Sequence, residues 1–156
     1  SYYNGRTRSV SGYDVSINNA EYTTADFTFS GTASASRKNQ GKTTMGLAAA
    51  QFANTNPKFT DVEFRVTDGY VKINRKAVTV TAVDKSKTYG TSDPTLTATV
   101  TGLIGSDTVT YSLSRASGNN VGTYTITPTG TATQGNYTVS FVNGTLTINP
   151  ANVTLT

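Results

Sequence analysis

Serine and threonine hydroxyl groups are abundant in this 156-residue sequence, but no histidine accompanies them. Acyl transfer by a hydroxyl needs an adjacent general base, and histidine is the commonest one. The Gly-x-Ser-x-Gly turn that exposes a serine nucleophile is also missing. The nine acidic residues are scattered singly, so the sequence predicts no facing carboxylate pair of the glycosidase kind. We therefore expect no catalytic residues and no enzyme activity.

Metal and cofactor sites have no support in the sequence either. Cysteine is absent along with histidine, and the aspartates lack the spacing of a calcium loop. A net charge of +4 without a clustered basic face argues against nucleic-acid binding. No apolar run approaches the roughly 18 residues that span a bilayer. We expect no metal, no cofactor, no nucleic-acid partner and no membrane insertion in this segment.

A small basic group, formed by Arg37, Lys38 and Lys42, carries the ligand-binding hypothesis. It falls in a predicted loop, where a solvated surface is the simpler interpretation. Its charges would otherwise suit sialylated or sulfated glycans. Tyrosine rings that stay exposed could stack on sugars, and at least half of the candidates should belong to the core. These candidates are Tyr2, Tyr3, Tyr13, Tyr22 and Tyr70.

The elements that hold these residues are predicted to be short β-strands. Hydrophobic residues make up 35% and charged residues 14%, and threonine, which favours pleated surfaces, is very common. Apolar and polar residues alternate in runs that are separated by turn residues. Strands are predicted at 10–17, 26–33, 42–47, 62–66, 70–73, 78–83, 96–101, 108–113, 123–127, 137–141 and 146–148. A single helical turn is predicted within 47–52.

The chain repeats itself with an offset of 75 residues. Residues 68–74 match 143–149, and the match resumes between 78–81 and 153–156. Asp68-Gly69 and Asn143-Gly144 each follow an alternating run, a pattern that predicts type I′ hairpins.

We therefore expect two tandem modules, with a stiff connection because no Gly, Pro or Ser lies between 70 and 83. The first spans 1–76 and lacks its opening strand, the second spans 77–150, and 151–156 begin a further module.

Each module is expected to be an immunoglobulin-like sandwich. The spacing of Asn120, Gly122 and Tyr124 is similar to the tyrosine corner of that fold, in which the phenol holds a loop. The alternative is a β-grasp-like curled sheet with one short helical turn. In both cases the protein is all-β.

The recurring residues resemble the MBG repeats of bacterial surface proteins. The YGX type is matched by the Tyr89-Gly90 turn within 87–96 and by the segments 100–103, 120–126, 136–137 and 143–148. The first module resembles the related YDG type through Tyr3-Asn4-Gly5, Gly12-Tyr13, 26–31 and 68–69, with Asn4 at the acid position.

The resemblance implies a non-catalytic module that serves as a stalk and as a weak multivalent adhesin toward host mucin or glycans. Its partners would be neighbouring repeats of the same chain. It also implies an extracellular location on a Gram-positive cell surface, with a cell-wall anchor outside this segment. A purely mechanical spacer, or an accessory domain of a surface carbohydrate-active enzyme, are the alternatives.

Overall fold

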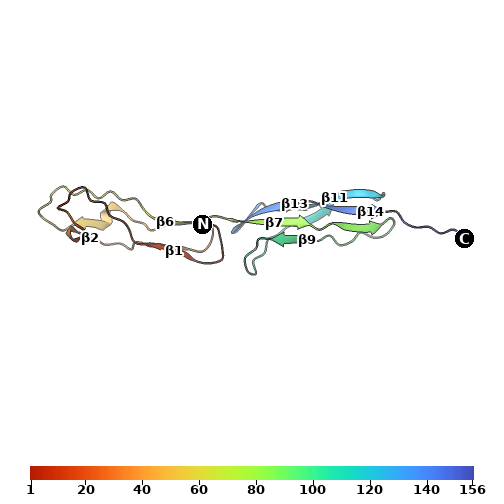
Figure 1. Cartoon of the computed structure of the whole chain (residues 1–156), viewed down its shortest axis with the longest axis horizontal. Coiled ribbons are helices and arrows are strands. Elements are labelled where there is room, and N and C mark those ends of the chain that lie inside the picture. Colours follow the sequence, from red (N-terminus) through yellow and green to blue (C-terminus); the bar gives the residue numbers. More distant parts are fainter. The chain divides into compact units, whose positions relative to one another are not determined.

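The computed structural model describes all 156 residues and divides them into two units, Ser1–Asn74 (unit 1) and Arg75–Thr156 (unit 2). Both units consist of β-strands, which confirms the predicted all-β class (Figure 1). The helical content is limited to two 3₁₀ turns, η1 (Thr24–Asp26) and η2 (Ala49–Gln51). The second turn lies within the predicted helical segment 47–52.

Unit 2 contains two four-stranded sheets. One has the order β12-β13-β7-β9, and the other has the order β10-β11-β14-β8. The first is built from β7 (Lys76–Ala82), β9 (Ala98–Thr101), β12 (Thr133–Gln134) and β13 (Tyr137–Val142). The second is built from β8 (Lys85–Thr88), β10 (Ser112–Arg115), β11 (Gly122–Thr129) and β14 (Gly144–Asn149). Most predicted strands of this unit are present, with their ends shifted by a few residues.

The prediction of a hairpin at Asn143-Gly144 is wrong. The consecutive strands β13 and β14 lie in different sheets, where β13 pairs in parallel with β7 and β14 pairs in parallel with β8 (Figure 1). Gly144 is the first residue of β14 and does not have the positive φ that a type I′ turn requires. The dipeptide therefore marks a passage from one sheet to the other.

The core of unit 2 comes from alternate residues of these strands. Val78 and Val80 of β7, Ile126 of β11, and Leu146 and Ile148 of β14 are all at most 1% exposed. The buried alternation of β7, β13 and β14 follows from the period of two residues along a strand.

Unit 1 contains three separate strand pairs. β1 (Arg8–Ser11) pairs with β3 (Ser34–Arg37), β2 (Phe27–Phe29) with β5 (Phe52–Asn54), and β4 (Gly41–Thr44) with β6 (Tyr70–Ile73), all antiparallel. The predicted strand at 62–66 is absent, and the one at 10–17 ends at Ser11. Both stretches have an alternating sequence, but neither forms a ladder with another strand.

The prediction of a hairpin at Asp68-Gly69 is also wrong. The carboxylate of Asp68 accepts hydrogen bonds from the backbone amides of Gly46 (3.0 Å) and Leu47 (2.9 Å), far away in the sequence. β6 then pairs with β4 rather than with the residues that precede it. Asp68 thus fixes the loop after β4 instead of closing a turn.

Aromatic rings fill much of unit 1. Phe52 lies at the centre, with ring centroids 4.8 Å from Phe29, 5.4 Å from Tyr13 and 5.7 Å from Phe64. Tyr22 packs edge-on against Phe59 at 5.0 Å. Large rings bury much area per residue, which suits a unit with short strands.

The internal repeat is visible in the backbone hydrogen bonds. The amide of Tyr89 donates to the carbonyl oxygen of Asn149, and that of Tyr3 donates to Asn74, both at 2.8 Å. Asn74 and Asn149 are related by the offset of 75 residues. Ser1 to Tyr3 therefore hold the place in unit 1 that the end of β8 and Tyr89 hold in unit 2.

Candidate functional site

The structure places the predicted basic group at the end of β3, in the loop that follows it, and in β4, and so separates its members. Arg37 donates to the carbonyl oxygens of Asn39 (2.9 Å) and Lys42 (3.3 Å) and to the hydroxyl of Thr43 (3.0 Å). A guanidinium engaged in this way holds its own loop in shape. Lys38 lies exposed in the same loop.

Lys42 belongs to an exposed surface that we call the β4–β6 face, formed by Lys42, Thr44, Tyr70 and Lys72. Lys42 is opposite Lys72 and Thr44 is opposite Tyr70 in the register of the two strands. The Lys42 ammonium lies 4.3 Å from the centre of the Tyr70 ring, and that tyrosine is 52% exposed. Such a cation–π contact stabilises the ring and the charge together.

Two lysines directly opposite each other repel, and this costs stability in a sheet. The β4–β6 face thus combines a net positive charge with an open aromatic ring. Sequence reasoning named Lys42 and Tyr70 but missed Lys72. The alternation along 70–73, in which Val71 and Ile73 are buried, would have placed Lys72 on the same side as Tyr70.

The other tyrosines divide between core and surface. Tyr3 and Tyr22 are buried, and the hydroxyl of Tyr22 donates to the Asn54 side chain at 3.0 Å. Tyr13 packs its ring on Phe29 and Phe52. Tyr2 is exposed, as Tyr70 is.

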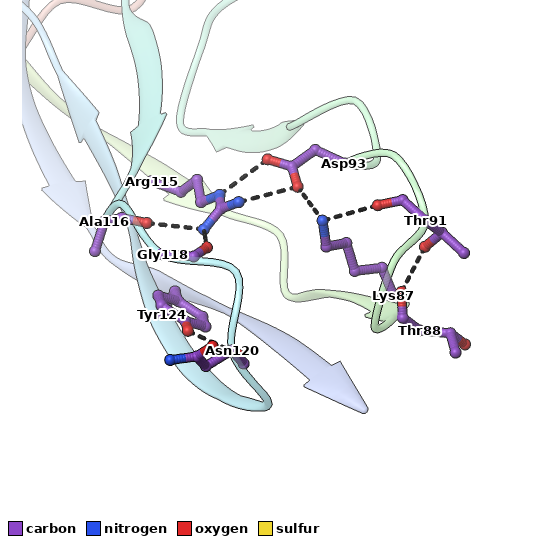
Figure 2. Close-up of polar contacts among 9 residues, drawn as sticks. All are labelled: Lys87, Thr88, Thr91, Asp93, Arg115, Ala116, Gly118, Asn120 and Tyr124. Carbon is purple, nitrogen blue, oxygen red and sulfur yellow. Dashed lines mark hydrogen bonds and ion pairs between the residues drawn. The ribbon is translucent and has the colours of Figure 1, made fainter. Parts of the chain in front are cut away.

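The strongest polar cluster lies in unit 2 and was not predicted. The Asp93 carboxylate receives two hydrogen bonds from Arg115 (2.9 and 3.0 Å) and one from Lys87 (2.7 Å), as Figure 2 shows. The Lys87 and Arg115 side chains are only 9% and 13% exposed. These hydrogen bonds, first from Arg115 and then from Lys87, lower the pKa of Asp93 to about 2. No sequence signal links Arg115 to a residue 22 positions away.

This cluster ties loops together rather than preparing a reaction. Arg115 also donates to the carbonyl oxygen of Ala116 and Lys87 to that of Thr91, each at 3.0 Å. The Arg115 guanidinium lies 5.3 Å from the ring of Tyr124, whose hydroxyl donates to the carbonyl oxygen of Asn120 at 2.7 Å (Figure 2). That last bond confirms the predicted role of Tyr124 in holding its loop. A carboxylate held ionised by two cations is a poor proton carrier at neutral pH.

No group of three or more acidic side chains comes close enough together to hold a metal ion. No helix has the length and apolar character needed to cross a bilayer.

Comparison with known families bears on unit 2. Residues 78–147, which run from β7 into β14, match the family model described as MBG domain (YGX type). The match supports an MBG-type repeat in this unit. The MBG domain is a repeat and binding-type module, not a catalytic family. No curated protein and no solved structure matches the chain.

Proposed function

We propose that the chain is a non-catalytic pair of tandem MBG-type repeats, YDG type and then YGX type, from a bacterial surface protein. The match at 78–147 supports the second repeat. The first is supported by the 75-residue offset and by the equivalent Tyr3–Asn74 and Tyr89–Asn149 hydrogen bonds. In this proposal the protein is extracellular, on a Gram-positive cell surface, with its anchor outside this segment.

The proposed activity is weak, multivalent binding of acidic glycans, such as those of host mucin. The observation that carries it is the β4–β6 face, where Lys42 and Lys72 lie opposite each other beside the exposed ring of Tyr70. An acidic sugar would relieve the repulsion between the two ammonium groups and stack on the ring. Lys38, on the neighbouring loop, would extend the positive charge. Many weak sites on one cell surface would give useful avidity.

Binding is tested with biotinylated protein tetramerised on streptavidin and applied to arrayed sialylated, sulfated and neutral glycans. We expect the acidic glycans to be retained, with binding that falls as salt is raised. The double variant Lys42→Gln/Lys72→Gln should lose binding several-fold. A matched variant, Arg6→Gln/Lys58→Gln, removes two exposed charges elsewhere in unit 1 and should bind as the parent does. Equal loss in both variants, or equal binding to neutral sugars, contradicts a site on this face.

A mechanical spacer is the second candidate, and strand direction in unit 2 favours it. β7 with β13, and β8 with β14, are parallel pairs, so the chain enters at the start of β7 and leaves at the far end of β14. Tension on the two ends of unit 2 then pulls β7 and β13 lengthwise past each other. The hydrogen bonds between these two strands bear this force together, instead of breaking one at a time. Force spectroscopy on the chain should show a distinct unfolding peak for unit 2. Extension without a peak would argue against a spacer under load.

A further inference from the structure

The outer face of the sheet β10-β11-β14-β8 in unit 2 consists almost entirely of hydroxyl side chains. Residues that lie opposite each other in a ladder share one side of the sheet. On the side away from the core, every ladder position is a threonine or a serine, with Asn149 as the exception. We call this side of the sheet the hydroxyl face.

No charged side chain lies on the hydroxyl face. The cations of this sheet are on its other side, because Lys85, Lys87 and Arg115 are opposite the core residues Leu146, Ile148 and Ile126. Protein surfaces are commonly about 25–35% charged residues, so a whole sheet face without a charge is unusual. Water or another neutral, hydrogen-bonding partner therefore suits this surface better than an ionic one.

The centre of the face is a two-by-two array of threonines: Thr123 and Thr125 on β11, opposite Thr147 and Thr145 on β14. The amide of Thr145 donates to the Asp84 carboxylate at 2.8 Å, and the carbonyl oxygen of Thr125 accepts from Ala116. Both groups thus point away from the β11–β14 ladder. The threonines therefore form non-hydrogen-bonded pairs, with Cα atoms about 4.5 Å apart across the strands and about 7 Å apart along each strand.

The four threonine side chains present a fixed pattern. A β-branched side chain has few χ1 rotamers, so hydroxyl and methyl groups repeat with the spacing of the backbone. None of the four hydroxyl groups makes a hydrogen bond within the chain. Neighbouring strands are twisted by about 20–25°, which limits a flat contact to adjacent strands such as β11 and β14. The array is thus rigid, free of internal partners and nearly flat.

We propose that the hydroxyl face binds the surface of ice crystals. Ice holds oxygen atoms at fixed positions that repeat at similar distances in two directions. The threonine hydroxyls bond to several of these positions at once, and the methyl groups fill the spaces between them. A single hydroxyl gains little when it exchanges liquid water for another partner, so a periodic partner is needed to give net binding. This activity does not depend on glycan binding by unit 1.

Two other partners fit the hydroxyl face less well. Sugar polymers are commonly held by stacking on aromatic rings, and this face has none. A stable dimer buries about 800 Å² on each partner, and four short strands offer roughly half of that area or less.

The fold itself does not require threonines in the array. In unit 1, β4 and β6 pair in the same register as β11 and β14, because Gly41 lies opposite Ile73 as Gly122 lies opposite Ile148. The β4–β6 face has lysines at the two places that correspond to Thr123 and Thr147. Unit 2 thus differs from its own repeat in just the residues that would bind ice.

The outer face of the other sheet of unit 2 also carries threonines, but with a different spacing. Thr81 is opposite Thr99, two residues from the pair in which Val83 donates to Thr97. Thr81 and Thr99 therefore form a hydrogen-bonded pair, with Cα atoms about 5.5 Å apart. Val142 interrupts the same row. This second face provides a control.

The growth of ice grains in a frozen sucrose solution tests the binding on the full chain. The parent should slow this growth, and Thr123→Lys/Thr147→Lys should need a several-fold higher concentration for the same effect. The fold accepts lysines there, as unit 1 shows. Thr125→Lys/Thr145→Lys, in the neighbouring row, should lose activity to the same extent. The control Thr99→Lys/Thr138→Lys adds equal charge at two exposed threonines of the other sheet and should act as the parent does.

A fluorescent label on the chain follows the binding directly. Labelled parent should be taken up into slowly growing ice, and labelled Thr123→Lys/Thr147→Lys should stay in the liquid. Ice binding is overturned if the parent neither slows grain growth nor enters the ice, if the lysine variants of the hydroxyl face act as the parent does, or if the control loses as much as they do. Retention of the parent on microcrystalline cellulose without an effect on ice would assign the face to a polysaccharide and also overturn ice binding.

Discussion

A Cβ atom on Gly144 would lie 2.7 Å from the carbonyl oxygen of Ala82. This close approach occurs where β13 gives way to β14 and β7 comes to its end, so the backbones can pass only if residue 144 has no side chain. Gly69, at the equivalent position of unit 1, has the side chain of Met45 as its nearest neighbour, at 3.0 Å. A methionine side chain can move aside, whereas a strand backbone resists displacement.

We therefore expect Gly144→Ala to destabilise unit 2 by about 1–3 kcal/mol, the usual cost of overpacking. Gly69→Ala should cost clearly less. Urea unfolding of the two variants, monitored by circular dichroism, measures both losses of stability. If both variants lose the same free energy of unfolding, the backbone between β13 and β14 can shift to make room for a methyl group.

Asp93→Asn should destabilise unit 2 at neutral pH, because it leaves Arg115 and Lys87 largely buried without their counter-charge. The pKa of Asp93 is lowered from 3.8 to about 2, so its contribution to stability is fully present above about pH 4. That contribution should be lost as the pH falls through about 2.

Urea midpoints of the parent and Asp93→Asn should therefore differ at pH 7 and converge as the pH approaches 2. Asp14→Asn, a change at an exposed carboxylate of unit 1, serves as the control and should leave the midpoints unchanged at pH 7. A difference for Asp93→Asn that stays constant down to pH 2 would show that the ion pairs are not its cause.

Tyr124→Phe should lower the stability of unit 2 by about 1 kcal/mol, the usual net value of one hydrogen bond. The phenol donates to Asn120 at 2.7 Å, while the ring packs against the core residues around Ile126 and Leu146. The variant keeps the ring, so only the loop should loosen. Faster amide exchange at 116–122 would localise the effect. Tyr111→Phe, in the same unit, removes an exposed hydroxyl and should change neither quantity.

Unit 2 should fold by itself and be the more stable of the two. Eight of its apolar side chains are buried, compared with five in unit 1, which has three separate strand pairs where unit 2 has two four-stranded sheets. Residues 75–150 expressed alone should unfold cooperatively in urea. Residues 1–74 alone should unfold at lower urea or without a sharp transition. A higher urea midpoint for 1–74 would show that the aromatic cluster of unit 1 contributes more stability than the larger buried core of unit 2.

The alternation of residues was enough to predict the all-β class and the repeat. It is a local property, because side chains of a strand point to opposite sides whatever the strand pairs with. The loop held by Tyr124 was also predictable, since donor and acceptor are only four residues apart. The basic group was predicted to lie in a loop, but Lys42 belongs to β4 and Arg37 ends β3, where its guanidinium is engaged by the following loop.

Which strands pair with each other was decided by the tertiary structure alone. Asn143-Gly144 has the composition of a hairpin turn, yet β13 finds its partner in β7, some sixty residues earlier, because Val78 and Val80 complete the core there. Residues 62–67 have the same alternating pattern and form no strand, because unit 1 offers no such partner. Asp93 and Arg115 likewise meet only after the strands are placed. A strand needs a neighbour for its backbone hydrogen bonds, and that neighbour is set by the fold and not by the strand's own residues.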